Sequence, residues 1–510
     1  MRILTAAEVR AVDREAIESY GIPGLLLMEH AAAAVAAAVE RRLGPNGRAC
    51  VVAGSGNNGG DGYATARLLL AGGVDAAVVA VTDPARLSGD AAENARMWQA
   101  LGGAVLPLTP GALDEVGSGD VVVDSLLGTG LSRPPEGAFA FAVKEMNACR
   151  ERGAAIVAVD LPSGLSADTG RPLGDVVNAD CTVTFGALKL GLVLEPGRHL
   201  AGETIVAGIS WPPWSLARLS PRLELLEEAR VRRSLPVRRA ASHKGTYGHC
   251  LIVAGSPGKS GAAALAGRGA LRGGAGLVTV ATRAEVIPQV LAHAMELMAA
   301  PLPGEGDLSR ADVAALVEAA SGKDVVLMGP GIPRGPETCA AIGEVLAGCE
   351  TRFVLDADAL NALAEEPGFI GRAKGEVVIT PHPGEMARLA GTTIGEIQED
   401  RVGSARRFAA AHGCTVILKG AGTVVADPDG NAAICPTGNA GMATAGSGDV
   451  LGGLVAALLA QGMTAGDAAR AAVFMHGAAG DRLVVRKGMA GLVASDLLDG
   501  IAEIWASWSL

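Results

Sequence analysis

The chain has few aromatic residues, no paired cysteine motif and no long apolar segment. Aromatic residues make up 3% of the 510 residues, and the eight cysteines are scattered without a C-x-x-C pair. This spacing favours reduced, buried thiols over a disulfide framework or a metal cluster. No apolar run approaches the ~20 residues of a membrane span. The start, MRILTAAEVRAVDRE, carries charges where a signal peptide needs an apolar stretch. We therefore expect a cytoplasmic protein with no membrane partner.

The chain also lacks an excess of basic residues. Its formal net charge is −11, which argues against a nucleic-acid partner. Hydrophobic residues make up 49% of the sequence, as in a globular protein, and its 71 glycines lie in discrete clusters. Glycine clusters allow the backbone to turn tightly and to approach a ligand closely. We expect small-molecule ligands.

Short β-branched runs recur along the chain, each followed by a glycine loop and a helix rich in alanine and leucine. ACVVAGSG and DVVVDSLLG are examples from the first half, and HCLIVAGSP and RFVLDADAL from the second. This alternation predicts an α/β fold made of two three-layer αβα domains, with sheets covered on both faces. Residues 216–235, rich in charge and proline, interrupt the rhythm. We therefore expect domains at 1–215 and 236–510, joined by a linker over 216–235.

In the first half, three strand ends carry polar residues. GSGNNGGDG (54–62) follows one strand and opens a helix, Asp124 ends a second strand, and Asp160 ends a third. The glycine-rich turn suits an anion, and its asparagines and Asp61 suit a hard cation, although a tight turn with a capping aspartate explains the turn equally well. Buried strands normally exclude charge, so the two further carboxylates favour a site.

NNGGD, DSLLGTGLSRP and DLPSG together resemble the Rossmann-like epimerase domain of NAD(P)H-hydrate repair enzymes. The resemblance implies a potassium ion held by Asn58, Asp124 and Ser163, and Asp160 as the catalytic acid or base. Lys189 fits the same family as a cation beside the site. The implied contacts with the hydrate are Asn57, Asn58, Gly59, Gly60, Asp61, Gly128, Thr129, Gly130, Leu131, Ser132, Arg133, Pro134 and Asp160.

In the second half, TAGSGDVLGG (444–453) places small residues at a helix N-terminus. The N–H groups of Gly446, Ser447 and Gly448 can stabilise a transferring phosphate, and Asp449 can take a hydroxyl proton. The alternative is an ordinary glycine-capped helix. ILKGAGTVV offers a lysine turn for a nucleotide, and ITPHPGE fixes His382 between two prolines at a strand end, which favours a ligand contact.

GPG, DADALNAL, TPHPGE, LKGAGT and GSGDVLGG, in this order, resemble the NAD(P)H-hydrate dehydratase branch of the ribokinase-like superfamily. The resemblance implies a magnesium ion, ADP as the phosphoryl donor in preference to ATP, and Asp449 as the catalytic base. The implied contacts with the hydrate are Ala275, Gly331, His382 and Asp449. The implied contacts with the nucleotide are Lys419, Gly420, Ala421, Gly422, Thr423 and Gly448.

The two resemblances imply a bifunctional enzyme of metabolite repair, both isomerase and lyase. The first domain would interconvert the R and S forms of NAD(P)H hydrate, and the second would return the S form to NAD(P)H through a phosphorylated intermediate. We also expect a homo-oligomer. Two alternatives are a ribokinase-like kinase of vitamin precursors and a cofactor-binding regulator without activity. The fused first half and TPHPGE argue against the kinase, and the presence of Asp160 and Asp449 argues against the regulator.

Overall fold

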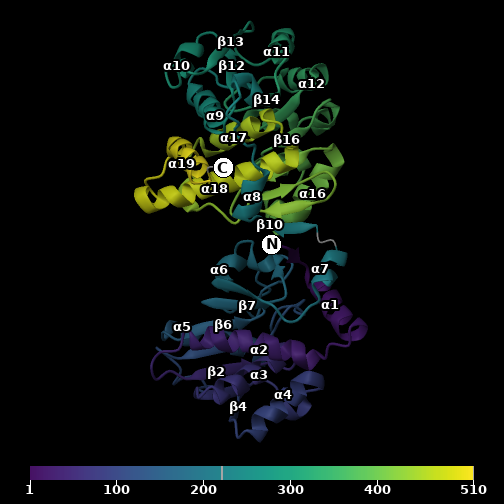
Figure 1. The fold of residues 1–510 in the computed structure, drawn as a ribbon, viewed down its shortest axis with the longest axis vertical. Helices are drawn as coiled ribbons and strands as arrows, with labels where there is room; N and C mark the ends of the chain where they lie inside the picture. The colour runs from purple at the N-terminus through teal and green to yellow at the C-terminus, as the bar shows by residue number, and fades with distance from the viewer. Residues whose placement is uncertain (220–221, 509–510) are drawn as a thin grey trace. The chain divides into compact units, whose positions relative to one another are not determined.

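The computed structural model describes residues 1–219 and 222–508. The chain divides into two compact units, Met1–Pro221 and Arg222–Leu510, and each has its own sheet (Figure 1). Parallel sheets with helices on their faces occur in both units, which confirms the predicted fold class.

The main sheet of the first unit is parallel throughout, in the order β4-β3-β2-β5-β6-β7-β9. The order reverses between β2 and β5, so the connections that follow these two strands run in opposite directions and leave room for a ligand. The strands are β2 (Ala49–Ala53), β3 (Ala76–Ala80), β4 (Val105–Pro107), β5 (Val121–Ser125), β6 (Ala155–Val159), β7 (Cys181–Phe185) and β9 (Glu203–Ala207). A small parallel pair joins β1 (Ile3–Leu4) to β8 (Leu188–Lys189).

Both faces of this sheet are buried. Val51 packs in one core with residues of α2, α3 and α4, whereas the next residue, Val52, packs in a second core with residues of α5. Alternation of this kind requires apolar side chains at successive strand positions, which explains the continuous apolar runs of the sequence. The helices of the unit are α1 (Ala6–Arg14), α2 (Gly24–Glu40), α3 (Asn57–Ala71), α4 (Gly89–Ala100), α5 (Ala138–Glu151), α6 (Gly197–Ala201) and α7 (Pro213–Leu219).

The sheet of the second unit has the order β10-β19-β18-β17-β16-β15-β14-β11-β12-β13, and its neighbours pair in parallel except where β18 meets β17 and β19. The order reverses between β11 and β14. The strands are β10 (Leu223–Leu225), β11 (His249–Val253), β12 (Leu277–Arg283), β13 (Met298–Leu302), β14 (Val325–Met328), β15 (Arg352–Leu355), β16 (Val377–Ile379), β17 (Thr415–Leu418), β18 (Val424–Ala426) and β19 (Ala432–Ile434).

Helix α17 (Ser447–Ala460) lies at the centre of the second unit. It packs on α9, α18 and α19 and on β14 and β15, and nearly all of its residues after Asp449 are buried. On the other face, α16 packs against β17 and β18. The remaining helices are α8 (Glu228–Ser234), α9 (Ser260–Arg272), α10 (Ile287–Leu291), α11 (Val313–Ala320), α12 (Thr338–Gly348), α13 (Ala357–Leu363), α14 (Pro383–Ala390), α15 (Ile394–Glu399), α16 (Arg401–His412), α18 (Ala465–Lys487) and α19 (Ala494–Ser507).

The stretch expected to be a linker is largely folded. Residues 222–235 supply β10, which pairs in parallel with β19, and α8, which packs on α18. Leu226 and Val231 are buried in the core of the second unit. The predicted linker over 216–235 is therefore corrected, because this segment completes the edge of the second sheet.

Two further features concern composition. All eight cysteines lie within the described residues, and they are buried thiols that form no disulfide, as the sequence predicts. In residues 1–219 and 222–508, no helix combines the length and the apolar character needed to cross a membrane.

Candidate active sites

In each unit, the residues singled out from the sequence, Ala275 excepted, gather at the carboxyl ends of the parallel strands. In the first unit they follow β2, β5 and β6, on both sides of the point where the strand order reverses. In the second unit they follow β14, β16 and β17, or begin α17. Loops at such an edge can converge on a ligand because the strands beneath them are rigid.

A fully buried carboxylate, Asp124, organises the first site. Its Oδ1 accepts a hydrogen bond from Ser163 Oγ at 2.6 Å, and its Oδ2 accepts one from the Ser163 backbone N–H at 2.7 Å. Burial raises the pKa of Asp124 to about 6, although these hydrogen bonds and one from the Leu126 N–H oppose the shift. The pair therefore ties β5 to the loop after β6.

Asn58, in the first turn of α3, supplies a further oxygen beside the loop after β5. A Cβ at Gly128 would lie 3.1 Å from Asn58 Oδ1, so the loop after β5 can approach the asparagine closely only because it has glycine there. Within the described chain, the buried Asn58 Nδ2 has no hydrogen-bond partner. The oxygen and nitrogen of an amide are assigned from their partners, so this orphan atom marks a place where the amide lacks one. The oxygens of Asn58, Asp124 and Ser163 fit a weakly charged hard cation.

Asp160 lies next to this group, in a strained conformation. Its φ is +65°, which a residue with a side chain rarely adopts and which often marks a functional site. Its Oδ1 accepts hydrogen bonds from Lys189 Nζ at 2.6 Å, from Thr184 Oγ1 at 3.1 Å and from the Phe185 N–H at 3.3 Å. Lys189 is wholly buried and also donates to the Phe185 carbonyl. The carboxylate is thus held by one buried cation and by β7.

Two more carboxylates lie close enough to interact with this pair. Burial raises the pKa of Asp61 well above its ordinary value, and the charges of Asp160 and Asp13 raise it further. Burial also raises the pKa of Asp13, although Trp211 Nε1, which donates to Asp13 Oδ1 at 2.8 Å, opposes the shift. One ammonium cannot balance three carboxylates, so this group of charges favours the protonated form of Asp61. Neither Asp13 nor Trp211 was singled out from the sequence.

The remaining hydrate contacts predicted in this unit form one turn and one loop. Asn57 to Asp61 make the first turn of α3, where the N–H groups of a helix start are free for an anion. The loop from Gly128 to Pro134 follows β5, and Ser132, Arg133 and Pro134 are exposed. The Thr129 carbonyl accepts a hydrogen bond from Arg10 at 3.4 Å. The structure therefore brings the predicted residues of this unit to one sheet edge.

A lysine between carboxylates organises the second site. Lys419, directly after β17, lies 2.9 Å from Asp356 Oδ1 and 4.0 Å from Glu385 Oε2, measured from Nζ. Burial lowers the pKa of Lys419, but Asp356, Glu385 and Asp449 together raise it above its ordinary value. A Cβ at Gly448 would lie 3.2 Å from Lys419 Nζ. The lysine turn and the first turn of α17, predicted to share a nucleotide, are thus in contact.

Asp449 is the third residue of α17. Burial raises its pKa to about 7, and the negative charges of Asp356 and Asp358 add to the shift while Lys419 opposes it. A carboxylate with a pKa near neutrality is suited to accept a proton. Gly446 is the N-cap of the helix, and its φ of +89° means that glycine is needed at this turn.

Asp356 also has a free atom. Its Oδ1 bonds Lys419 and the Ala357 N–H, whereas its buried Oδ2 has no partner among the residues described. A Cβ at Gly452 would lie 3.5 Å from this Oδ2, so the atom points toward α17. The Oδ2 of Asp356 is therefore available to a magnesium ion, which keeps several waters and needs few protein ligands.

His382 caps α14. Its Nδ1 accepts hydrogen bonds from the N–H groups of Gly384 and Glu385, so the proton of the neutral ring lies on Nε2. That Nε2 is 3.4 Å from Glu385 Oε1, and the side chain is 51% exposed. The Nδ1 of the predicted ligand histidine therefore caps the helix, whereas its Nε2–H is a donor on a half-exposed side chain.

Two buried residues, missed in the sequence, fix this site from behind. Arg401 donates to the carbonyls of Leu418 and Lys419, at 3.1 and 3.2 Å, and so holds the nucleotide turn. His476, on α18, lies 3.0 Å from the Ser447 carbonyl through its Nε2, and burial lowers its pKa to about 4. Both contacts join segments far apart in the sequence, and no local motif signals them.

One predicted contact is wrong. Ala275 lies between α9 and β12, at the amino ends of the strands and hence at the sheet edge opposite Gly331, His382 and Asp449. The alanine beside Gly331 is Ala262, in the first turn of α9. A Cβ at Gly331 would lie 3.1 Å from the Ala262 Cβ. The repeated Gly and Ala of residues 261–276 make such a shift easy.

Comparisons with known proteins cover both units. A family model described as NAD(P)H-hydrate dehydratase matches residues 250–503, and one described as YjeF-related protein N-terminus matches residues 24–191. The chain is 43% identical to a bifunctional NAD(P)H-hydrate repair enzyme of Moorella thermoacetica, over 98% of this chain and 96% of that one. It is 39% identical to the enzyme of the same name from Escherichia coli, over 98% and 93%.

One solved structure aligns with about half of this chain. It is an ADP/ATP-dependent NAD(P)H-hydrate dehydratase from Bacillus subtilis, co-crystallised with ATP and Mg²⁺, with 33% identity and a TM-score of 0.49 over 56% of this chain and 98% of that one. The family predicted from the motifs is confirmed by the two family models and by relatives that align along almost the whole chain. The chain belongs to the family of bifunctional NAD(P)H-hydrate repair enzymes, which combine an epimerase unit with a dehydratase unit.

Proposed function

We propose that Asp449 is the base that starts dehydration in the second unit. It takes the proton from the hydroxyl that hydration placed on the nicotinamide ring, and the alkoxide oxygen attacks the terminal phosphorus of ADP. The bond between this phosphorus and the oxygen that bridges it to the rest of the nucleotide breaks, and AMP departs with the electron pair. The observation that carries this proposal is a buried carboxylate with a pKa near 7, in the first turn of a helix and beside Lys419.

The phosphorylated hydrate then loses its phosphate. The C–O bond breaks with the electron pair leaving on the phosphate, a proton leaves the adjacent ring carbon, and the dihydropyridine is restored. Phosphorylation is needed because hydroxide is a poor leaving group. The N–H group of Gly448 and the ammonium of Lys419 stabilise the transferring charge. Asp356, whose Oδ2 has no partner among the described residues, would hold a magnesium ion, which supplies charge neutralisation on the phosphates.

The first unit supplies the epimer that the second unit accepts. Asp160, held by Lys189 and by a strained backbone, exchanges a proton with the hydrate, and Asp61 lies close enough for its charge to interact with that of Asp160. Asn58, Asp124 and Ser163 would hold a potassium ion that anchors the surrounding loops. These assignments are supported by the geometry of the oxygens and by the orphan amide of Asn58. The predictions of a homo-oligomer and of a cytoplasmic location rest on the sequence alone.

The dehydratase assignment is tested with Asp449→Asn. On S-NADH hydrate with ADP, the variant should return NADH slower by about 10²–10⁴-fold, because a positioned base is lost. Epimerisation of the two hydrates should continue at the wild-type rate. Asp499→Asn is the matched control, since Asp499 is an exposed carboxylate of α19 that pairs with Arg272. Near-normal turnover of Asp449→Asn would show that another group is the base.

The epimerase assignment is tested with Asp160→Asn in a chromatographic time course. The variant with ADP should consume the S hydrate while the R hydrate accumulates. Asp175→Asn, an exposed carboxylate that pairs with Lys144, is the control. If Asp160→Asn consumes both epimers equally, and faster than they interconvert spontaneously, Asp160 has no catalytic role.

A further inference from the structure

Two cations from different loops share one carboxylate at the active edge of the second sheet. Lys259 Nζ lies 3.3 Å from Asp358 Oδ2, and Arg334 Nε lies 3.1 Å from Asp358 Oδ1. Lys259 precedes α9, Arg334 follows β14, and Asp358 is in the first turn of α13. Two cations and one anion leave one positive charge uncompensated within this group, which we call the basic clamp.

The basic clamp borders the proposed hydrate site. A Cβ at Gly331 would lie 3.1 Å from the Cβ of Lys259, so the lysine packs directly against this glycine. Ser256 Oγ donates to the Gly331 carbonyl at 2.8 Å and joins the two loops. Asp358 lies near enough to Asp449 for their charges to repel. The clamp therefore flanks the reacting groups without being one of them.

The cations of the clamp are accessible, whereas their carboxylate is not. The side chains of Lys259 and Arg334 are 56% and 49% exposed, and that of Asp358 is 16% exposed. Lys419 differs, because it is 20% exposed and lies between Asp356 and Glu385. The edge thus has two separate cationic positions: one in the nucleotide turn and one beside Gly331.

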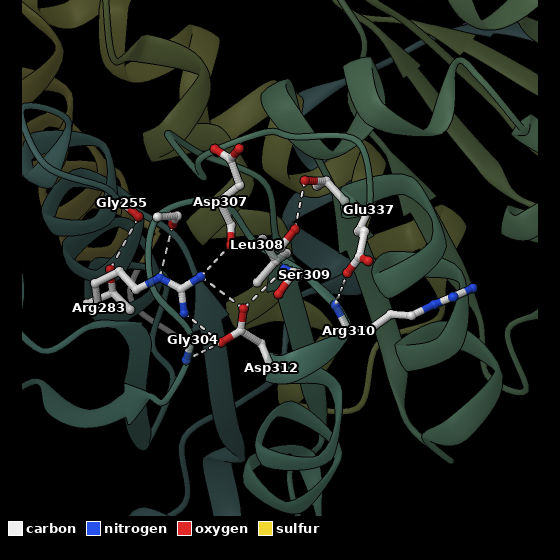
Figure 2. A network of polar contacts seen from close by, with 12 residues as sticks. Gly255, Arg283, Gly304, Asp307, Leu308, Ser309, Arg310, Asp312 and Glu337 are labelled. Carbon is white, nitrogen blue, oxygen red and sulfur yellow. Dashed lines mark hydrogen bonds and ion pairs between the residues drawn. The ribbon is translucent and has the colours of Figure 1, made fainter.

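The loop that carries Arg334 is anchored from both sides. Figure 2 shows Arg283, at the end of β12, bonded to both carboxylate oxygens of Asp312, at 2.5 and 2.9 Å, with both side chains buried. This pair holds the segment that contains Leu308, whose N–H donates to the Pro333 carbonyl at 3.2 Å. Thr338 Oγ1 donates back to the Leu308 carbonyl at 2.8 Å. Arg334 therefore projects from a fixed loop.

We propose that Lys259 and Arg334 bind a phosphate of the hydrate, while Lys419 serves the phosphates of the donor nucleotide. This inference rests on the proposed function, because the clamp can bind the hydrate only if the hydrate is the substrate and lies on the Gly331 side of the site. A guanidinium and an ammonium are the usual partners of phosphate, and Asp358 holds both in place until the ligand arrives. A dinucleotide hydrate offers a bridging pyrophosphate, and its NADP form offers a 2′-phosphate as well.

The test is steady-state kinetics of the full-length protein with Lys259→Ala, Arg334→Ala and the double variant. The substrates are the S hydrates of NADH, of NADPH and of reduced nicotinamide riboside, which has no phosphate. Each variant should raise KM for the dinucleotide hydrates by about tenfold, as expected for one charge-assisted hydrogen bond. The kcat, the KM for ADP and the KM for the riboside hydrate should not change. Arg334→Lys should restore part of the affinity.

Lys374→Ala and Arg486→Ala are the controls, because each removes an exposed cation that pairs with a glutamate away from the clamp. Equal increases in KM for the NADH and NADPH hydrates identify the pyrophosphate as the group that the clamp binds. An increase in KM confined to the NADPH hydrate identifies the 2′-phosphate. An unchanged KM for both, an equal increase for the riboside hydrate, or an increase only in the KM for ADP would overturn the inference.

A wrong assignment of the dehydratase function would give a different experimental result from a wrong assignment of the clamp. A wild-type protein that returns no NADH with ADP contradicts the dehydratase mechanism, not the clamp. Calorimetric titration of the wild type and the double variant with NADPH hydrate, without a nucleotide donor, then reports the clamp directly. Weaker binding by the double variant supports it, and equal binding overturns it.

Discussion

The rate of dehydration should follow the ionisation of Asp449. An ordinary aspartate, with a pKa of 3.8, would be fully ionised from pH 6 to pH 8, and the rate would be flat. Burial and the neighbouring carboxylates raise the pKa of Asp449 to about 7. Such a base is about 9% ionised at pH 6, about half ionised at pH 7 and about 91% ionised at pH 8. Because only the ionised form accepts a proton, kcat/KM should rise about tenfold between pH 6 and pH 8.

The assay is the initial rate of NADH formation from S-NADH hydrate at saturating ADP, over this pH range and at constant ionic strength. Asp358→Asn removes one of the charges that raise the pKa of Asp449, so its profile should shift toward lower pH. At pH 6 the rate relative to the plateau should then exceed that of the wild type. A flat profile, or a rate that falls as the pH rises from 6 to 8, would refute the reasoning.

Three further predictions concern the ion, the buried pair and the boundary. Asp124→Ala should slow epimerisation and leave dehydration unchanged. It should also abolish the preference of the epimerase for potassium over sodium or a bulky organic cation at matched ionic strength. A wild-type epimerase whose rate does not depend on the cation would contradict the ion site. Lys189→Met should destabilise the first unit by about 3–5 kcal/mol in denaturant unfolding, because it leaves Asp160 buried without its cation; an unchanged unfolding midpoint would contradict the pairing. A fragment that starts at Arg222 should be soluble and active as a dehydratase, whereas one that starts at Pro236 loses β10 and α8 and should aggregate; equal behaviour of the two fragments would show that β10 is dispensable.

The sequence predicted best what is encoded locally. Apolar runs followed by glycine loops correctly predicted parallel strands, because a strand buried on both faces must be apolar at every position. The contact between the Lys419 turn and the start of α17 also followed, because both lie at the carboxyl ends of strands in one sheet. By contrast, β10 has a glutamate at its centre and pairs with β19, which lies far along the chain. No local pattern identifies it as a strand.

Residues that act through distant contacts were missed for the same reason. Asp13 lies in an N-terminal helix and becomes part of the first site only because the fold brings it near Lys189 and Trp211. Arg401 and His476 bond backbone carbonyls, which any sequence provides. Motifs reveal the residues that meet a ligand, but the buried groups that position those residues become visible only in the folded chain.

The most direct test of the account is recovery of NADH absorbance from a mixture of R and S hydrates by the full-length protein, with and without ADP. With ADP, the absorbance of the whole mixture should return in one process, because the first unit converts the R form as the second consumes the S form. Without a nucleotide, no NADH should return, although the epimers should still interconvert. Recovery of NADH that needs no nucleotide, or recovery that stops when the S form is exhausted, would contradict the account.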